Sequence, residues 1–280
     1  MTTTLRPDGA EEPTPHGGRT RRWRICVNGR PVGGLRTTAL PRGDQWWGEI
    51  SELEVTEGRR RGRATVGVLA AEEVLRGWNC RRADVTVPAG SAAGLRLAEA
   101  LGYASRMQNM AKHLDLPPAL PPGVTDRPMT AAEFDAWLAE AREHYVDELA
   151  ASGLTREQAR IKSDADHHHL LPQGRTTEDV VLRHLQDVAG TVVGDLWLAL
   201  RQGLLPDGSP FAWVMVVKVD EAHRGRGHGR ALMQVAEREC LAAGVRDLGL
   251  NVFSRNAVAI RLYESLGYTV TRRTLGKDLL

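Results

Sequence analysis

The glycine-rich stretch between Val219 and Leu232 has the clearest chemical potential in this chain. It follows an apolar run, Phe211 to Val219, that is typical of a buried strand, and it leads into Ala231–Ala242, whose apolar spacing predicts an amphipathic helix. Glycines let a backbone approach a ligand closely, and the first N–H groups of a helix have no partner within it. Because these free donors and the helix dipole suit a phosphate, the stretch predicts an anion site.

The residue pattern of this stretch differs from the motifs of two common phosphate-binding loops. An ATP-type P-loop ends in Gly-Lys-Ser/Thr, and no Lys-Ser/Thr pair follows here. A dinucleotide fingerprint reads Gly-x-Gly-x-x-Gly, whereas Gly225, Gly227 and Gly229 are each separated by one residue, and no parallel βαβ series surrounds them. The alternative to an anion site is that this stretch binds no ligand and is only a glycine-rich helix start with solvated arginines.

Two motifs together resemble the signatures of the GNAT superfamily of N-acetyltransferases. The spacing Arg224-x-x-Gly227-x-Gly229 resembles that family's acyl-CoA pyrophosphate loop, and the segment Asn251–Tyr268 resembles its second signature. The elements expected over residues 125–280, in the order β-α-α-β-β-β-α-β-α-β, are similar to the whole GNAT fold. That fold class is α/β (α+β), with a mixed, mostly antiparallel central sheet flanked by helices.

The resemblance implies that acetyl-CoA is the co-substrate and that no metal takes part. Val219 would offer strand-edge backbone groups to the pantetheine, and the amides of Arg226–Ala231 would hold the pyrophosphate. The full set of residues to which the resemblance assigns acyl-CoA binding is Val217, Val219, Arg224, Gly225, Arg226, Gly227, His228, Gly229, Arg230, Ala231, Asn251, Asn256 and Tyr263.

Tyr263 is the candidate catalytic residue. It lies seven residues after Asn256, so the two side chains share one face of a helix. A phenol has a pKa near ~10, close to that of an alkyl thiol, so Tyr263 can protonate a departing thiolate. In the family, a tyrosine at this position is proposed to do so for CoA. The plain alternatives are that Tyr263 only packs and that Asn256 only caps its helix.

The general base stays unassigned. An amine acceptor arrives largely as ammonium, so a proton must leave before the nitrogen attacks the thioester. The strand before the glycine loop contains no acid, and Asp220 and Glu221 lie just beyond it. A water relay, a base on the acceptor-side helices and an acceptor of lower pKa are all open.

The chain repeats itself at a shift of 165 residues. Arg96–Tyr103 matches Arg261–Tyr268, and 14 of the 45 positions from Arg59 to Tyr103 are identical, where chance would give about 3. The first copy lacks candidate catalytic and binding residues of the second copy. Ala98 aligns with Tyr263, Thr86 with Asn251, Ser91 with Asn256 and Ala64 with Gly229. We therefore expect this copy to be structural, or at most a weak acyl-CoA binder.

Composition, the internal repeat and the resemblance to the GNAT family together imply four regions. Residues 1–18 are expected to be disordered, and residues 19–115 to form a truncated, non-catalytic GNAT-like domain. Four prolines make residues 116–124 a linker. Residues 125–280 are expected to form the catalytic domain, and two capping boxes at its start, Thr130-x-x-Glu133 and Thr155-x-x-Gln158, predict a pair of helices.

The segment Asp166–His169, with three consecutive histidines, raises the question of a metal site. Consecutive helical residues point about 100° apart and cannot converge on one ion. A polar helix end near the acceptor cleft is the better interpretation, and one of these histidines could act as an acceptor-side base.

The overall charge and composition give no indication of a nucleic-acid or membrane partner. A net charge of +2 is too small to indicate nucleic acid or a membrane surface, and the 42% hydrophobic and 26% charged content fits a globular protein. Cys26, Cys80 and Cys240 lie far apart without metal-type spacing. With no apolar span of membrane length and no signal-peptide core, we expect a cytoplasmic protein.

The resemblance to the GNAT superfamily thus implies an acetyl-CoA-dependent N-acetyltransferase whose acceptor is a primary amine of a small molecule or a peptide. Two alternatives share the fold: a non-catalytic acyl-CoA-binding or sensor protein, and acetylation of an amino sugar as by mycothiol synthase, a tandem member of the family. A purely structural interaction protein is a third. The acceptor, the acyl-chain preference and the oligomeric state are not assigned.

Overall fold

The computed structural model describes residues 2–15, 17–42, 44–57, 62–151 and 154–279. The chain divides into two compact units, each built from separate segments. The first comprises Met1–Met107, Asp147–Ala159 and Arg272–Leu280, and the second comprises Gln108–Val146 and Arg160–Thr271. No described helix is long and apolar enough to cross a membrane.

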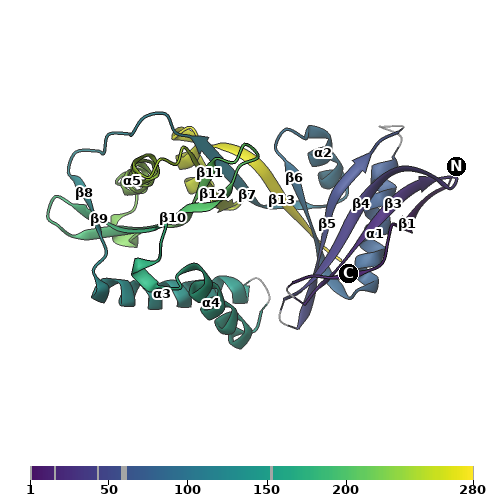
Figure 1. Ribbon diagram of the computed structural model, residues 1–280, viewed down its shortest axis with the longest axis horizontal. Coiled ribbons are helices and arrows are strands. Elements are labelled where there is room, and N and C mark those ends of the chain that lie inside the picture. The colour runs from purple at the N-terminus through teal and green to yellow at the C-terminus, as the bar shows by residue number, and fades with distance from the viewer. Residues whose placement is uncertain (1, 16, 43, 58–61, 152–153, 280) are drawn as a thin grey trace. The chain divides into compact units, whose positions relative to one another are not determined.

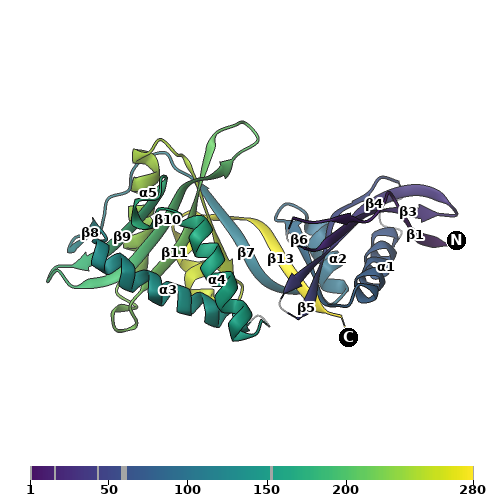
Figure 2. The ribbon, with the colours of Figure 1, turned by 60° about the horizontal axis from the view of Figure 1, so that its bottom comes forward.

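The described residues of the first half of the chain form seven strands and two helices. They are β1 (Thr3–Pro7), β2 (Glu12–Pro13), β3 (Arg19–Val27), β4 (Arg30–Arg42), β5 (Gln45–Val55), α1 (Arg63–Gly77), β6 (Cys80–Pro88), α2 (Ala92–Ala100) and β7 (Ala104–His113). The strand order in the first unit is β1-β3-β4-β5-β6-β13. Residues of α1 and α2 share one buried core with these strands, and the two helices lie together against them (Figure 2).

The second half follows the element order predicted from the sequence. It comprises β8 (Val124–Pro128), α3 (Ala131–Ala151), α4 (Arg156–Leu170), β9 (Val180–Asp187), β10 (Val192–Leu204), β11 (Pro210–Val219), α5 (His228–Ala242), β12 (Asp247–Phe253), α6 (Ala257–Ser265) and β13 (Thr269–Asp278). In the second unit the strand order is β7-β12-β11-β10-β9-β8. Strands β8, β9, β10 and β11 pair antiparallel with their neighbours in this order, and β11 pairs parallel with β12, so the predicted mixed, mostly antiparallel sheet is confirmed.

Helices cover both faces of the second unit's sheet (Figure 1). Because side chains alternate along β10, Leu196 and Leu198 enter the core shared with α5, whereas Trp197 packs with Phe134 and Trp137 of α3. The same alternation places Asp195 on the α3 side of the sheet. Helix α3 therefore lies over a face that carries polar as well as aromatic residues.

Local signals fixed several element boundaries as predicted. Asn28 and Gly29 both have positive φ, 49° and 85°, as expected for an Asn-Gly hairpin turn between β3 and β4. Both capping boxes form, since the N–H of Thr130 donates to Glu133 and the N–H of Thr155 donates to Gln158. Residues 114–123, which include the prolines of the predicted linker, form neither helix nor strand.

The amino-terminal segment differs from the disorder expected for residues 1–18. Strand β1 pairs antiparallel with β3 from Thr3↔Val27 to Pro7↔Trp23, and β2 also pairs with β3. Leu5 packs against the first unit's core, which gives the segment an apolar contact that its composition alone did not indicate. Residues 1 and 16 of this range lie outside the described residues.

The last strand of each copy crosses into the unit of the other copy, so that β7 from Gln108 onward belongs to the second unit and β13 from Arg272 onward to the first. Strand β13 pairs antiparallel with β6 of the first unit, from Arg272↔Pro88 to Asp278↔Arg82. Conversely, β7 neighbours β12 of the second unit. A sequence repeat shows that two similar strands exist, but it does not show which sheet each one joins.

Each exchanged strand contributes a lysine to an ion pair with a buried glutamate, and the two ion pairs occupy equivalent positions of the repeat. Lys112 of β7 donates to both carboxylate oxygens of Glu237 on α5, each at 2.8 Å. At the positions 165 residues apart, Lys277 of β13 donates to both oxygens of Glu72 on α1, at 3.0 and 2.9 Å. Each glutamate is buried, so each exchanged lysine neutralises a charge that would otherwise be costly inside the core.

Candidate active site

Strands β11 and β12 separate at the point where a ligand could enter the sheet. Their parallel pairing runs from Phe211↔Asp247 to Val214↔Leu250. Beyond it, β11 continues to Val219 and β12 to Phe253. A shift in the register between β10 and β11 leaves Met215 as an extra residue at the start of the separation. The β11 edge past this bulge, which includes Val217 and Val219, can therefore offer backbone groups to an extended ligand.

The glycine loop leads from β11 into α5 as an uncapped helix start. Gly225 and Gly227 have φ of 78° and 85°, and Gly227 is the N-cap of α5 without a side-chain capping bond. The helix begins at His228, three residues earlier than predicted, so Gly229, Arg230 and Ala231 lie in its first turn. The amides of this turn and the helix dipole favour an anion.

Gly229 has a different role from the other two glycines. A Cβ at this position would lie 3.2 Å from Cδ2 of Leu262 on α6, so the glycine allows the two helices to approach closely. Arg230 donates to the hydroxyl of Ser265, also on α6, at 2.6 Å. The glycine loop and the helix that carries Tyr263 are thus adjacent in the second unit.

Basic side chains surround the loop. Arg224 donates through Nε to the carbonyl of Val219 at 3.3 Å, which ties the loop to the end of β11. The rings of His223 and His228 lie 6.4 Å apart, and the Nδ1 atom of each is enclosed without a hydrogen-bond partner among the described residues. The family resemblance predicts a binding role for His228 but not for His223, although the position of His223 next to Arg224 in the chain was a signal for it.

The second motif spans β12 and α6. Asn251 is exposed on β12, one residue after the last pair with β11. Asn256 is the N-cap of α6, and its side-chain oxygen accepts from the N–H of Ala259 at 3.1 Å, so it does cap its helix. Tyr263 is 9% exposed beside Tyr268, and burial raises the pKa of its phenol.

Polar residues on the α3 side of the sheet are the group that sequence reasoning missed. Nδ1 of His184 on β9 lies 2.6 Å from Oδ1 of Asp195 on β10, and both residues are buried. Burial raises the pKa of Asp195. Lys218, the cross-strand neighbour of Asp195 on β11, pairs with Glu140 of α3. The strand register brings His184, Asp195 and Lys218 together, and the packing of α3 on the sheet adds Glu140.

The three histidines of α4 point in different directions, as their spacing predicts. His167 is buried against Trp197, its Nδ1 lies 2.8 Å from the carbonyl of Ser163, and burial lowers its pKa. His169 instead lines a pocket next to β10. Among the described residues, no group of three or more His, Cys, Asp or Glu side chains could hold a metal ion.

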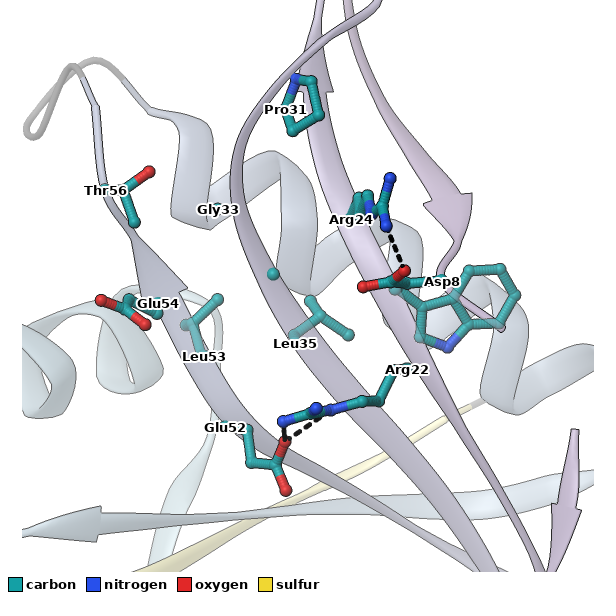
Figure 3. A pocket seen from close by; sticks show the side chains of 12 residues that line it. Asp8, Arg22, Arg24, Pro31, Gly33, Leu35, Glu52, Leu53, Glu54 and Thr56 are labelled. Carbon is teal, nitrogen blue, oxygen red and sulfur yellow. Dashed lines mark hydrogen bonds and ion pairs between the residues drawn. The ribbon is translucent and has the colours of Figure 1, made fainter. Parts of the chain in front are cut away.

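A hollow of about 780 Å³ lies on the sheet of the first unit (Figure 3). Four of its charged lining residues form two ion pairs, Arg22 with Glu52 and Arg24 with Asp8. The first copy keeps a helix start at Gly62, with φ of 71°, but the corresponding Arg59 lies outside the described residues. Ala98, which aligns with Tyr263, is buried in the core.

Comparison with known proteins gives a consistent result over both halves of the chain. Residues 5–103 and 133–268 each match the family model described as acetyltransferase (GNAT) family. The chain is 28% identical over 152 residues to an uncharacterized N-acetyltransferase, YdgE, of Bacillus subtilis, covering 54% of this chain and 95% of the relative. It is 30% identical over 240 residues to a mycothiol acetyltransferase of Acidothermus cellulolyticus, covering 79% and 67% of the two chains.

Solved structures share the fold over most of the chain. A GCN5-related N-acetyltransferase from Sphaerobacter thermophilus superposes with a TM-score of 0.60 at 23% identity, covering 92% of this chain and 80% of that one. A tandem GNAT protein from the clavulanic acid biosynthesis pathway superposes with a TM-score of 0.55 at 20% identity, covering 96% and 85%. At these identities the likeness concerns the fold.

Proposed function

Because the chain belongs to the acetyltransferase (GNAT) family and is an N-acetyltransferase, we propose that it transfers an acetyl group from acetyl-CoA to a primary amine. The main observation behind the proposal is that the pairing of β11 and β12 ends at Val214↔Leu250. The edge of β11 thus exposed leads to the start of α5, which has no side-chain cap. An open strand edge suits a pantetheine arm, and a free helix start suits its pyrophosphate.

The second copy would do the chemistry, within the region 125–280 predicted to be catalytic. The amides at the start of α5 bind the pyrophosphate, and Val217 and Val219 bind the pantetheine through the β11 edge. The acceptor nitrogen attacks the thioester carbonyl directly, and the carbon–sulfur bond then breaks. Positioning of the two substrates supplies much of the rate.

Tyr263 would protonate the departing thiolate. Its raised pKa keeps the phenol protonated throughout the neutral range, which is the state that a general acid needs. Its place on α6, joined to the glycine loop by Arg230 and Ser265, supports this role. The first copy has Ala98 at the aligned position and would serve as a structural partner.

The test is amine-dependent release of CoA thiol from acetyl-CoA by the full chain, combined with calorimetry of acetyl-CoA binding. We expect binding and turnover with at least one amine in a broad panel. Tight binding without turnover of any amine would support the alternative, an acyl-CoA sensor. Failure to bind acetyl-CoA would contradict both.

A second acceptor class is favoured by the mycothiol acetyltransferase relatives, which match 79% of this chain. We therefore include acetylation of an amino sugar as the alternative reaction of the same site. Glucosamine in the amine panel provides its direct test.

A further inference from the structure

A pocket of about 310 Å³ opens on the α3 side of the second unit's sheet. The carboxyl end of α4, the loop before β9 and the outer half of β10 line it, together with Met215 of β11. Met215 is the bulge residue at which β11 and β12 begin to separate. The pocket thus reaches the start of the opening that we assign to the acetyl donor.

The wall of the pocket next to the bulge is apolar. Trp197 pairs across the ladder with Val216, which directly follows Met215, and Trp197 is 4% exposed. Val180, Ala199 and Leu170 continue this wall. A hydrocarbon segment of a ligand would lose water against these side chains, which favours an apolar body in this part of the pocket.

The far end of the pocket is charged. Arg201 pairs with Asp179, so these two charges largely compensate each other. Glu178, which also lines the pocket, is exposed and has no ion pair within the described part of the chain. Glu178 is thus a carboxylate of this end whose charge no neighbouring described residue neutralises, and such a group attracts a cation.

The distance between the apolar wall and the charged end of the pocket follows from the positions of their residues on β10. Trp197 and Arg201 are four residues apart on β10, which corresponds to about 13 Å along a strand. The long side chains of Glu178 and Arg201 shorten the free span. The pocket volume is at the lower limit for small-molecule sites, so a compact ligand fits it better than a peptide.

We propose that this pocket binds the acceptor and that the acceptor is a small aliphatic diamine. One nitrogen lies near Met215 and attacks the thioester, the hydrocarbon chain lies along Trp197, and the second nitrogen, as ammonium, pairs with Glu178. The proposal rests on the proposed acetyltransferase function and names its acceptor class. The attacking nitrogen forms the amide bond, loses its proton to solvent and displaces CoA as the thiol.

The experiment compares hexane-1,6-diamine with hexan-1-amine by CoA release. In the wild type we expect kcat/KM per reactive nitrogen to be about fivefold higher for the diamine, the size typical of an exposed ion pair. Glu178→Gln should abolish this preference and leave the rate with hexan-1-amine within about twofold. Glu178→Asp keeps the charge and should retain most of the preference.

Asp135→Asn is the matched control, because Asp135 is an exposed acid of α3 that does not line the pocket. It should keep the diamine preference. Equal rates for both amines, a preference that survives Glu178→Gln, or faster turnover of glucosamine than of any diamine would overturn the acceptor assignment while acetyl transfer itself stands. No CoA release with any amine would overturn the proposed function as well.

Discussion

At the scale of single residues, the phenol of Tyr263 combines burial with a raised pKa. We expect Tyr263→Phe to lower kcat about 100-fold with little change in KM for acetyl-CoA, because the lost proton donation acts mainly in the transition state. Since burial places its pKa above the ordinary value near 10, the wild-type rate should show no loss from tyrosine ionisation below about pH 10.

The measurement is the pH–rate profile of both forms. Tyr103→Phe is the control, because Tyr103 is a buried tyrosine of the first unit and its loss should leave kcat unchanged. Turnover of Tyr263→Phe that equals the wild type at every pH would exclude the acid role.

The backbone conformation of Gly227 should affect the binding of acetyl-CoA. Its φ of 85° is unfavourable for any residue with a Cβ, by about 1 kcal/mol. In Gly227→Ala this strain should shift the free loop away from its present conformation, so that acetyl-CoA binding, which restores it, weakens about fivefold in calorimetry. Gly62→Ala introduces the same strain, at φ of 71°, into the first copy and should leave that affinity unaltered. Equal losses in the two variants would contradict the assignment of the site to the second copy.

At the scale of elements, the start of α3 depends on one carboxylate. Glu133 closes the capping box with Thr130 and accepts two hydrogen bonds from Arg127 of β8, at 2.8 and 2.6 Å. These contacts, the Arg127 bond first, lower the pKa of Glu133. A depressed carboxyl pKa stabilises the fold above the unfolded value near ~4.3, and this stabilisation is lost as the pH falls through the folded pKa.

We therefore expect Glu133→Gln to lower the urea midpoint at pH 7 and to lower it progressively less as the pH falls below about 4. Urea unfolding of both proteins across this range is the measurement. Asp135→Asn, which alters an exposed acid on the same helix, should cause no such pH-dependent difference. A gap that is constant from pH 7 to pH 2 would refute the ion-pair contribution.

At the scale of the whole molecule, the exchanged strands make each compact unit depend on both copies of the repeat. Lys112→Met would leave Glu237 buried without its cation and should destabilise the second unit by about 3 kcal/mol in urea unfolding. The charge-reversed double variant Lys112→Glu with Glu237→Lys should recover part of the loss.

The repeat itself provides the control for this prediction. If β7 stayed with its own copy, Lys112 would meet Glu72, the residue 165 positions before Glu237. Pairing Lys112→Glu with Glu72→Lys should therefore give no recovery, since Glu72 is bonded to Lys277. Recovery in that combination alone would show that the strands are not exchanged.

The sequence by itself determined the features that depend on local chemistry. Glycine spacing predicted the turn between β11 and α5, the capping boxes predicted the starts of α3 and α4, and the internal repeat predicted two related halves. These features follow from backbone conformations and hydrogen bonds within a few residues of one another. The order of elements in the second half followed for the same reason.

Only the tertiary structure decided which strands pair and which distant side chains meet. The two copies end in similar strands, so either could complete either sheet, and the contacts of Lys112 and Lys277 with the opposite copy identify the exchange. The His184–Asp195 pair likewise depends on the register between β9 and β10. Such contacts join residues far apart in the chain, and their energies depend on burial that local patterns do not specify.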